Sequence, residues 1–194
     1  WHQVITARYS DEYPYMLFHA MTGSEGLGVL SKFPIEDLGF LLEVHGWHPA
    51  WHVQIDMPMG PVQMLDTHLR SLFRGESNAL SSYLSTSDDH LGEIEGFTAF
   101  CKPGQPTLVL GDFNESPDGE AVGYLEAPPR GFQNALPLYH PGQPTWHDPP
   151  AWQMEETIDH IFFNSQFDSL NSWVLNGGNS DHLPVLAHLE EAPP

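Results

Sequence analysis

The stretch Gly111-Asp112-Phe113-Asn114 decides the fold prediction, because it places two short polar side chains directly after the apolar run 107–110. Such a run predicts a buried β-strand that ends at these residues. Side chains two apart on an extended backbone point to the same side, so Asp112 and Asn114 can converge on one water molecule, metal ion or phosphate oxygen. Aspartate and asparagine also end strands as turn residues, and this stretch alone leaves both interpretations open.

Three other apolar segments carry the residue types that phosphoester chemistry needs. The segment QMLDTHL places His68 late in a predicted strand, and TIDHIFF places Asp159 inside another. The segment SDHLPV places Asp181 and His182 just before a third strand. Each segment is unremarkable alone. Together they supply carboxylates, which hard metal ions prefer as ligands, and imidazoles, which move protons near neutral pH.

In this order, the segments resemble the motifs of the endonuclease/exonuclease/phosphatase superfamily, whose fold is that of deoxyribonuclease I. The segment 26–35 is also similar to the family's GxxxxSRxPI strand, with Lys32 where arginine is usual. The resemblance runs from about Tyr13 to about Leu189 and implies an α/β fold class: a four-layer αββα sandwich of two packed, mostly antiparallel β-sheets flanked by helices. The family motifs THL, GDFN, IDYIF and SDHxPV correspond to THL at 67–69, GDFN at 111–114, IDHIF at 158–162 and SDHLPV at 180–185.

The resemblance implies a catalytic role for five of the matched residues. His68 would donate a hydrogen bond to a phosphate oxygen, and Asn114 would hold the phosphate or a second metal ion. His182 would face the phosphate, with Asp159 as the carboxylate that orients its imidazole. Asp112 would orient or deprotonate the attacking water, although the sequence leaves open whether Asp112 or His182 is the base.

The resemblance also implies a metal site for Mg²⁺ or Mn²⁺. Its first ligand would be Asp181, from the SDH motif, and Asp112 and Asn114 would supply further oxygen atoms. The family begins with a strand that carries an asparagine and a second strand that ends in Gln-Glu, whose glutamate is a principal metal ligand. Neither strand is found here, and Trp1-His2-Gln3-Val4 is similar to the stretch that follows the Gln-Glu motif. We therefore expect residues 1–194 to be one domain of this type that is N-terminally incomplete, or a degenerate member with a weakened site.

The charge balance bears on the substrate. Six lysines and arginines stand against 26 aspartates and glutamates, which gives a formal net charge of −20. Proteins that grip a polynucleotide need several cations that neutralise phosphates, and the six cations of this chain are scattered. We therefore expect a small-molecule or lipid-linked phosphodiester or phosphomonoester as substrate rather than a long nucleic acid. The alternatives are a nuclease that acts on DNA or RNA and a catalytically inactive binding module that keeps the fold.

Length and composition fit a single globular domain, which we expect to be a monomer. The chain has 194 residues, of which 40% are hydrophobic, enough for a sizeable core. No apolar run approaches the roughly 20 residues of a transmembrane helix. Cys101 is the one cysteine, which excludes an internal disulfide.

Apolar spacing predicts the secondary structure. The apolar residues of 91–101 recur at helical intervals after a plausible N-cap at 87–89, and Leu80 and Leu84 suggest a shorter helix before it. Several of the strand-like runs are apolar at consecutive positions, which predicts strands that are covered on both faces. These runs are 27–30, 41–44, 51–55, 62–67, 108–110, 158–163 and 185–189.

A histidine triad needs a separate interpretation. His45, His48 and His52 are spaced three and four apart, like metal ligands on one helix. Gly46 and Pro49 lie between them, and Pro49 would break that helix. We therefore expect two aromatic hairpin strands joined by a turn here rather than a zinc site.

Two further positions near the motifs have structural interpretations. His160 stands where the family usually has tyrosine, and on a strand it points away from Asp159, so we expect a packing residue. The stretch Trp146-His147-Asp148 is expected to form a loop over the mouth of the site or, alternatively, to anchor the core through its aromatic ring.

Overall fold

A six-stranded sheet forms the centre of the molecule. The computed structural model describes residues 1–20, 26–42, 48–71, 79–147 and 154–193. Within the sheet, β5 and β6 run parallel, and the other neighbouring strands are antiparallel. The strand order is β3 (Ile35–Leu41), β4 (Ala50–Met57), β5 (Gly60–His68), β6 (Thr107–Asp112), β10 (Asp159–Phe163) and β7 (Gln133–Asn134).

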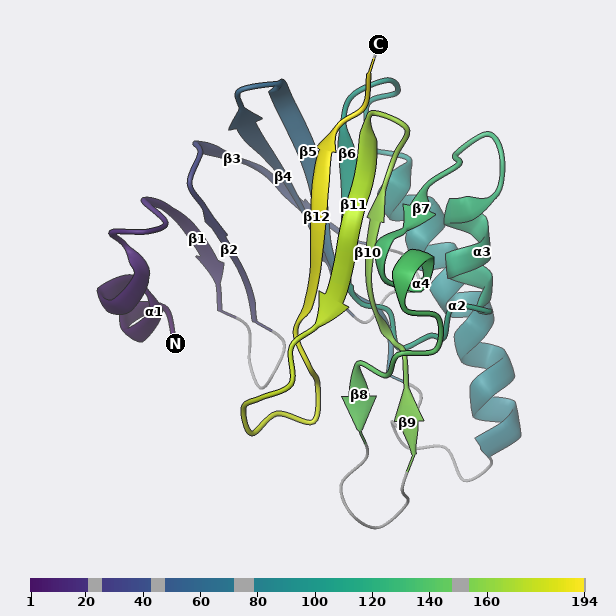
Figure 1. The fold of residues 1–194 in the computed structure, drawn as a ribbon. Helices are drawn as coiled ribbons and strands as arrows, with labels where there is room; N and C mark the ends of the chain where they lie inside the picture. Colours follow the sequence, from purple (N-terminus) through teal and green to yellow (C-terminus); the bar gives the residue numbers. More distant parts are fainter. Residues whose placement is uncertain (21–25, 43–47, 72–78, 148–153, 194) are drawn as a thin grey trace.

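Two antiparallel strand pairs cover one face of this sheet. They are β1 (Tyr15–His19) with β2 (Leu27–Ser31), and β11 (Phe167–Val174) with β12 (Val185–Glu191). In Figure 1 the β11–β12 pair lies in front of the central sheet, and the β1–β2 pair lies toward the N-terminus. Buried contacts join each pair to the sheet. Val29 of β2 packs with Trp51 and Val53, and Phe167 of β11 packs with Val62 and Phe163.

Helices cover the opposite face. They are α2 (Ala79–Thr98) and α3 (Glu120–Glu126), visible beside the sheet in Figure 1. Ile94 and Phe97 of α2 and Leu125 of α3 pack against buried sheet residues such as Leu65 and Phe162. The remaining elements are α1 (His2–Tyr9), α4 (Ala135–Tyr139), β8 (Trp146–His147) and β9 (Glu155–Glu156).

This arrangement confirms the predicted α/β sandwich. On β6, Leu108 and Leu110 face the strand pairs while Val109 faces the helices, so a run of consecutive apolar residues marks a strand covered on both sides. Asp112, two residues after Leu110, continues on the side of the strand pairs. The end of β6 therefore delivers a carboxylate to that side of the sheet.

The helix prediction was wrong at its start. Helix α2 begins at Ala79, so the predicted N-cap at 87–89 lies inside it, and the two predicted helices are one. Ile94 and Phe97 of this helix pack in the core, and the polar residues 87–89 do not interrupt it. Among the helices of the described ranges, none combines the length and apolarity that a bilayer span requires.

Several strand boundaries also differ from the prediction. The run at 41–44 was expected to be a strand, but β3 is Ile35–Leu41, and residues 43–47 lie outside the described residues. The antiparallel β3–β4 pair agrees with the expected aromatic hairpin. Strands β1 and β11 were not predicted. Polar residues interrupt the apolar pattern of β11, whereas β1 is a short apolar run, Tyr15–His19, that the strand prediction left out.

Candidate functional site

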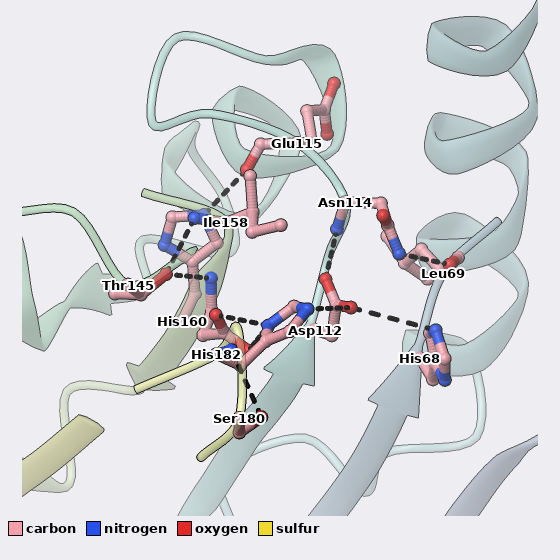
Figure 2. A network of polar contacts seen from close by, with 11 residues as sticks. His68, Leu69, Asp112, Asn114, Glu115, Thr145, Ile158, His160, Ser180 and His182 are labelled. Atoms are coloured by element: carbon pink, nitrogen blue, oxygen red, sulfur yellow. Dashed lines mark hydrogen bonds and ion pairs between the residues drawn. The ribbon is translucent and has the colours of Figure 1, made fainter. Parts of the chain in front are cut away.

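Three neighbouring strands bring their polar residues together at one edge of the central sheet. The last residue of β5, His68, lies opposite Asp112, the last residue of β6. Asp112 in turn lies opposite Asp159, the first residue of β10. Figure 2 shows Asp112 between His68 and His182, with Asn114 above it. The register of the sheet therefore converts motifs that are distant in sequence into one cluster.

Gly111 makes the close approach of β5 and β6 possible. Its φ is +138°, a conformation that side chains rarely adopt. A Cβ atom built on Gly111 would lie 1.8 Å from the carbonyl oxygen of Thr67. The glycine of the GDFN motif is therefore required by the backbone geometry immediately before Asp112.

The turn after β6 fixes the orientation of the Asp112 carboxylate. The backbone N–H of Asn114 donates to Oδ1 of Asp112 at 2.8 Å, and Asn114 has a φ of 48°, which asparagine tolerates better than most residues. The Asn114 side-chain amide donates to the carbonyl oxygen of Leu69 at 3.0 Å. This bond leaves the amide oxygen of Asn114 as the atom able to contact a ligand.

His182 is held by Asp159. Nδ1 of His182 lies 3.0 Å from Oδ2 and 3.2 Å from Oδ1 of Asp159, within the expected range for an imidazole–carboxylate pair. This hydrogen bond raises the pKa of His182 against the opposing effect of partial burial. Nε2 of His182 lies 3.8 Å from Oδ2 of Asp112, on the other side of the ring. A hydrogen-bond donor is thus aimed toward the second carboxylate.

The carboxylate of Asp112 has a perturbed pKa and faces two histidines. Burial, reinforced by the negative charge of Asp159, raises the pKa of Asp112 to about 6. Nε2 of His68 lies 3.7 Å from the same oxygen atom that faces His182. The ring of His68 stacks on the buried ring of His48, with 4.6 Å between centroids. His48, which sequence reasoning treated only as part of a false metal triad, therefore packs against a candidate site residue.

All six predicted site residues line one cleft of about 840 Å³. Its lining contains five carboxylates and four histidines and, among the residues that the structure describes, no lysine or arginine. A cleft of this composition repels a phosphate unless a cation is bound, because the carboxylates set the sign of the local field. The carboxylates are Asp112, Glu115, Glu156, Asp159 and Asp181, and the histidines are His48, His68, His90 and His182.

One cluster of potential metal ligands differs in part from the predicted ligand set. In the described part of the chain, one group of three acidic or histidine side chains has ligand atoms within 4.8 Å of one another: Asp112, Asp159 and His182. Asp181 lines the same cleft but is exposed, and its backbone carbonyl accepts a hydrogen bond from the N–H of His147 at 2.9 Å. The carboxylate of Asp181 thus stands at the rim.

The two described histidines of the triad are buried in separate surroundings. His52 is buried in β4, where burial lowers its pKa, and His48 is buried beside His68. Neither belongs to a group of potential metal ligands among the described residues, and His45 lies outside them. No zinc site is supported here by the part of the chain that the structure describes.

His160 is a packing residue, as predicted. It is 1% exposed, and burial lowers its pKa to about 4. Asn134 donates its side-chain N–H to Nδ1 of His160, so Nε2 carries the proton and donates to the carbonyl oxygen of Glu115; both distances are 2.9 Å. The neutral imidazole therefore ties the loop after Asn114 to the sheet (Figure 2).

Two supporting residues were missed by the sequence analysis. The carboxylate of Glu115 accepts the backbone N–H groups of Glu120 and Ala121 at the start of α3, and burial raises its pKa to about 7. Thr145 is fully buried between Trp146, which lines the cleft, and the preceding turn. The one sequence signal for either is a nearby proline, Pro117 two residues after Glu115 and Pro144 directly before Thr145, which indicates only a turn. The expected loop at 146–148 is strand β8 at its first two positions, and Asp148 lies outside the described residues.

The sequence model of the Endonuclease/Exonuclease/phosphatase family matches residues 2–182. The chain belongs to this family. Its members are hydrolases that act on phosphoester bonds, and a divalent metal ion is typical of them. A comparison with curated proteins gave no match.

Solved structures share the fold at low sequence identity. An endonuclease/exonuclease/phosphatase from Beutenbergia cavernae superposes with a TM-score of 0.74 at 18% identity, over 98% of this chain and 57% of that chain. The 3′ phosphatase NExo from Neisseria, bound to a product DNA hairpin, gives 0.67 at 15% identity, over 97% and 93%. The human Nocturnin catalytic domain with bound sulfate gives 0.63 at 16% identity, over 98% and 76%. The chain thus spans little more than half the length of the Beutenbergia protein.

Proposed function

We propose that this chain is a divalent-metal-dependent phosphoesterase that hydrolyses small or lipid-linked phosphodiesters or phosphomonoesters. The observation that carries the proposal is the composition of the cleft. The imidazole–carboxylate pair Asp159–His182 opens into a space whose described lining holds five carboxylates and no lysine or arginine. Such a cleft binds a phosphate only together with a cation.

The donor set fits Mg²⁺ or Mn²⁺. We assign Asp112 and Asp181 as carboxylate ligands, and the side-chain oxygen of Asn114 as a third ligand or a phosphate contact, because hard cations take oxygen atoms and often only one or two carboxylates. The raised pKa of Asp112 reflects burial and the neighbouring charge of Asp159, and a cation would relieve both. When bound, the ion supplies charge neutralisation for the phosphate oxygens.

The chain's own residues divide the proton transfers. The hydrogen bond to Asp159 raises the pKa of His182 and so stabilises its charged form, whose Nε2 would donate to a phosphate oxygen. Asp112 would orient the attacking water and take its proton. His68, whose Nε2 faces the same carboxylate oxygen, donates to a second phosphate oxygen.

The scarcity of cations favours a small substrate. The chain carries six lysines and arginines, and several of the described ones are already engaged: Arg70 pairs with Asp89, and Lys32 lies 3.8 Å from Glu12. A duplex carries about one negative charge per 1.7 Å, so an acidic surface repels it along its length. A small phosphoester meets only the local field of the cleft.

The decisive experiment compares salt profiles. We expect the purified protein to hydrolyse bis(4-nitrophenyl) phosphate or a phospholipid headgroup diester with Mg²⁺ or Mn²⁺ but not with EDTA. Its rate should stay flat or rise with added salt, as screening weakens repulsion. Efficient cleavage of plasmid DNA that falls steeply with salt would establish the nuclease alternative instead. Metal binding without turnover of any phosphoester would leave the inactive binding module.

A further inference from the structure

Thr145 occupies an unusual position next to the catalytic pair. It is 0% exposed and immediately precedes β8, in a segment that neither the family motifs nor the proposed chemistry uses. Its hydroxyl and both of its backbone polar groups make hydrogen bonds, and all of the partners lie in the two segments that carry Asp159 and His182. Figure 2 shows Thr145 beside Ile158.

The hydroxyl of Thr145 holds the segment that enters β10. Its Oγ1 accepts the backbone N–H of Ile158 and the backbone N–H of Asp159, each at 3.0 Å. The backbone N–H of Thr145 donates to the carbonyl oxygen of Glu156 at 2.9 Å. A hydroxyl oxygen has two lone pairs, so this one side chain satisfies two partly buried N–H groups and fixes the backbone that carries the Asp159 carboxylate.

The backbone on the other side of Thr145 holds the segment that carries His182. The carbonyl oxygen of Thr145 accepts the N–H of Leu183 at 2.7 Å, and the N–H of His147 donates to the carbonyl oxygen of Asp181 at 2.9 Å. These two bonds flank His182, which forms a β-bridge with Trp146. His182 lies in a connection between strands, so these bonds replace the support that a regular strand would give.

We propose that Thr145 is a positioning residue that sets the geometry of the Asp159–His182 pair by holding one partner through its hydroxyl and the other through its carbonyl. As far as turnover is concerned, this inference rests on the proposed phosphoesterase function. Threonine suits the task because its β-branched side chain has few rotamers, which keeps the acceptor oxygen in place. Valine has nearly the same shape but no acceptor, so it would leave the N–H groups of Ile158 and Asp159 without their partner.

The test compares Thr145→Val with Thr145→Ser and with Thr157→Val. Serine keeps the hydroxyl. Thr157 is a second buried threonine of the same hairpin, whose hydroxyl donates to the carbonyl oxygen of Gln143 at 2.7 Å rather than to the pair, so it controls for general loss of stability. The first readout is the proton resonance of the His182 Nδ1–H group, which a hydrogen bond to carboxylate moves far downfield. The second is the split between kcat and KM for bis(4-nitrophenyl) phosphate with Mg²⁺.

We expect Thr145→Val to lose or broaden the His182 resonance and to lower kcat by about 10- to 100-fold with KM nearly unchanged, because small misplacements of reacting groups have effects of this size. Thr145→Ser and Thr157→Val should keep the His182 resonance and a kcat close to that of the unaltered protein. An unchanged resonance in folded Thr145→Val would overturn the proposal, whatever the activity. A changed resonance in a protein that hydrolyses no phosphoester would retain the positioning role and reject the function.

If Thr145→Val does not fold, amide hydrogen exchange of the unaltered protein decides the matter. The N–H groups of Ile158, Asp159 and Leu183 should then exchange slowly and at one common rate, because one residue holds all three. Independent, widely different rates for Asp159 and Leu183 would show that Thr145 does not couple the two segments.

Discussion

Asp112 and Asp159 lie directly opposite each other on the adjacent antiparallel strands β6 and β10. Two carboxylates at directly paired positions repel each other and destabilise a sheet. Their compensation comes from outside the sheet, since the His182 ring contacts Asp159 through Nδ1 and faces Asp112 through Nε2. We interpret the pair as a site where stability is given up for the ability to hold a proton or a cation.

Asp159→Asn should lower kcat by about 100-fold or more while changing KM little, because an amide neither fixes the imidazole tautomer nor stabilises its charged form. Steady-state kinetics with a small phosphodiester measures both constants. The matched control is Asp168→Asn, an exposed aspartate of β11 that should behave like the unaltered protein. A loss of only a few-fold in Asp159→Asn would remove the orienting role that we assign to this carboxylate.

Removal of the metal should abolish activity reversibly. Mn²⁺ binding, followed by electron paramagnetic resonance, should be weakened at least tenfold in Asp112→Asn, because a cation in this cleft would lose its most buried carboxylate ligand. His68→Gln should retain Mn²⁺ binding yet lose turnover, since His68 is assigned to the phosphate. Equal Mn²⁺ affinity in the Asp112→Asn and unaltered proteins would place the ion elsewhere.

Gly111→Ala should destabilise the protein by more than about 1 kcal/mol, because alanine is strained at positive φ and its Cβ would collide with the carbonyl oxygen of Thr67. Urea unfolding followed by fluorescence measures the free energy of unfolding. Gly123→Ala is the control. Gly123 lies in α3 with open space around its Cβ position, and alanine there should stabilise by roughly 0.5–1 kcal/mol. Similar effects at the two positions would mean that β5 and β6 can separate freely.

Asp66 should make stability depend on pH. Burial in β5 raises its pKa from 3.8 to about 7, so the folded protein keeps a proton that the unfolded chain has released between these values. The free energy of unfolding contributed by Asp66 therefore falls as pH rises through this window. Asp66→Asn should match the Tm of the unaltered protein below about pH 4 and exceed it by roughly 10 °C above about pH 7. Asp56→Asn, at an exposed site of β4, should show no such difference, and a constant offset at all pH values would argue against buried ionisation at Asp66.

The sequence was most informative where function and secondary structure coincide. Asp112 and His68 were expected at the ends of strands and Asp159 inside one, so their place on a sheet could be predicted, although Asp159 is the first residue of β10. Which carboxylate lies opposite which could not, because cross-strand register depends on pairing with distant segments. Thr145 escaped notice for a related reason: all its partners are backbone groups, which leave no pattern in the side chains.

The start of helix α2 was predicted wrongly because a local sequence signal was misleading. Polar residues at 87–89 have the composition of a cap, and local preference alone favours a break there. Packing of the apolar side of α2 on the sheet overrides that preference, with Ile94 and Phe97 in the core. The burial of Asp66 could not be predicted either, since a single acidic residue in an apolar run gives no indication that it is buried.

The candidate site is assembled from the ends of β5, β6 and β10 and from the connection that carries His182, segments spread over more than half of the sequence. Contacts of such long range form slowly, because distant parts of the chain must first be brought together. The catalytic geometry should therefore be among the last features acquired during folding and among the first lost on partial unfolding. In consequence, the presence of the His182–Asp159 hydrogen bond should show whether the whole domain is folded, as well as whether the site is correctly arranged.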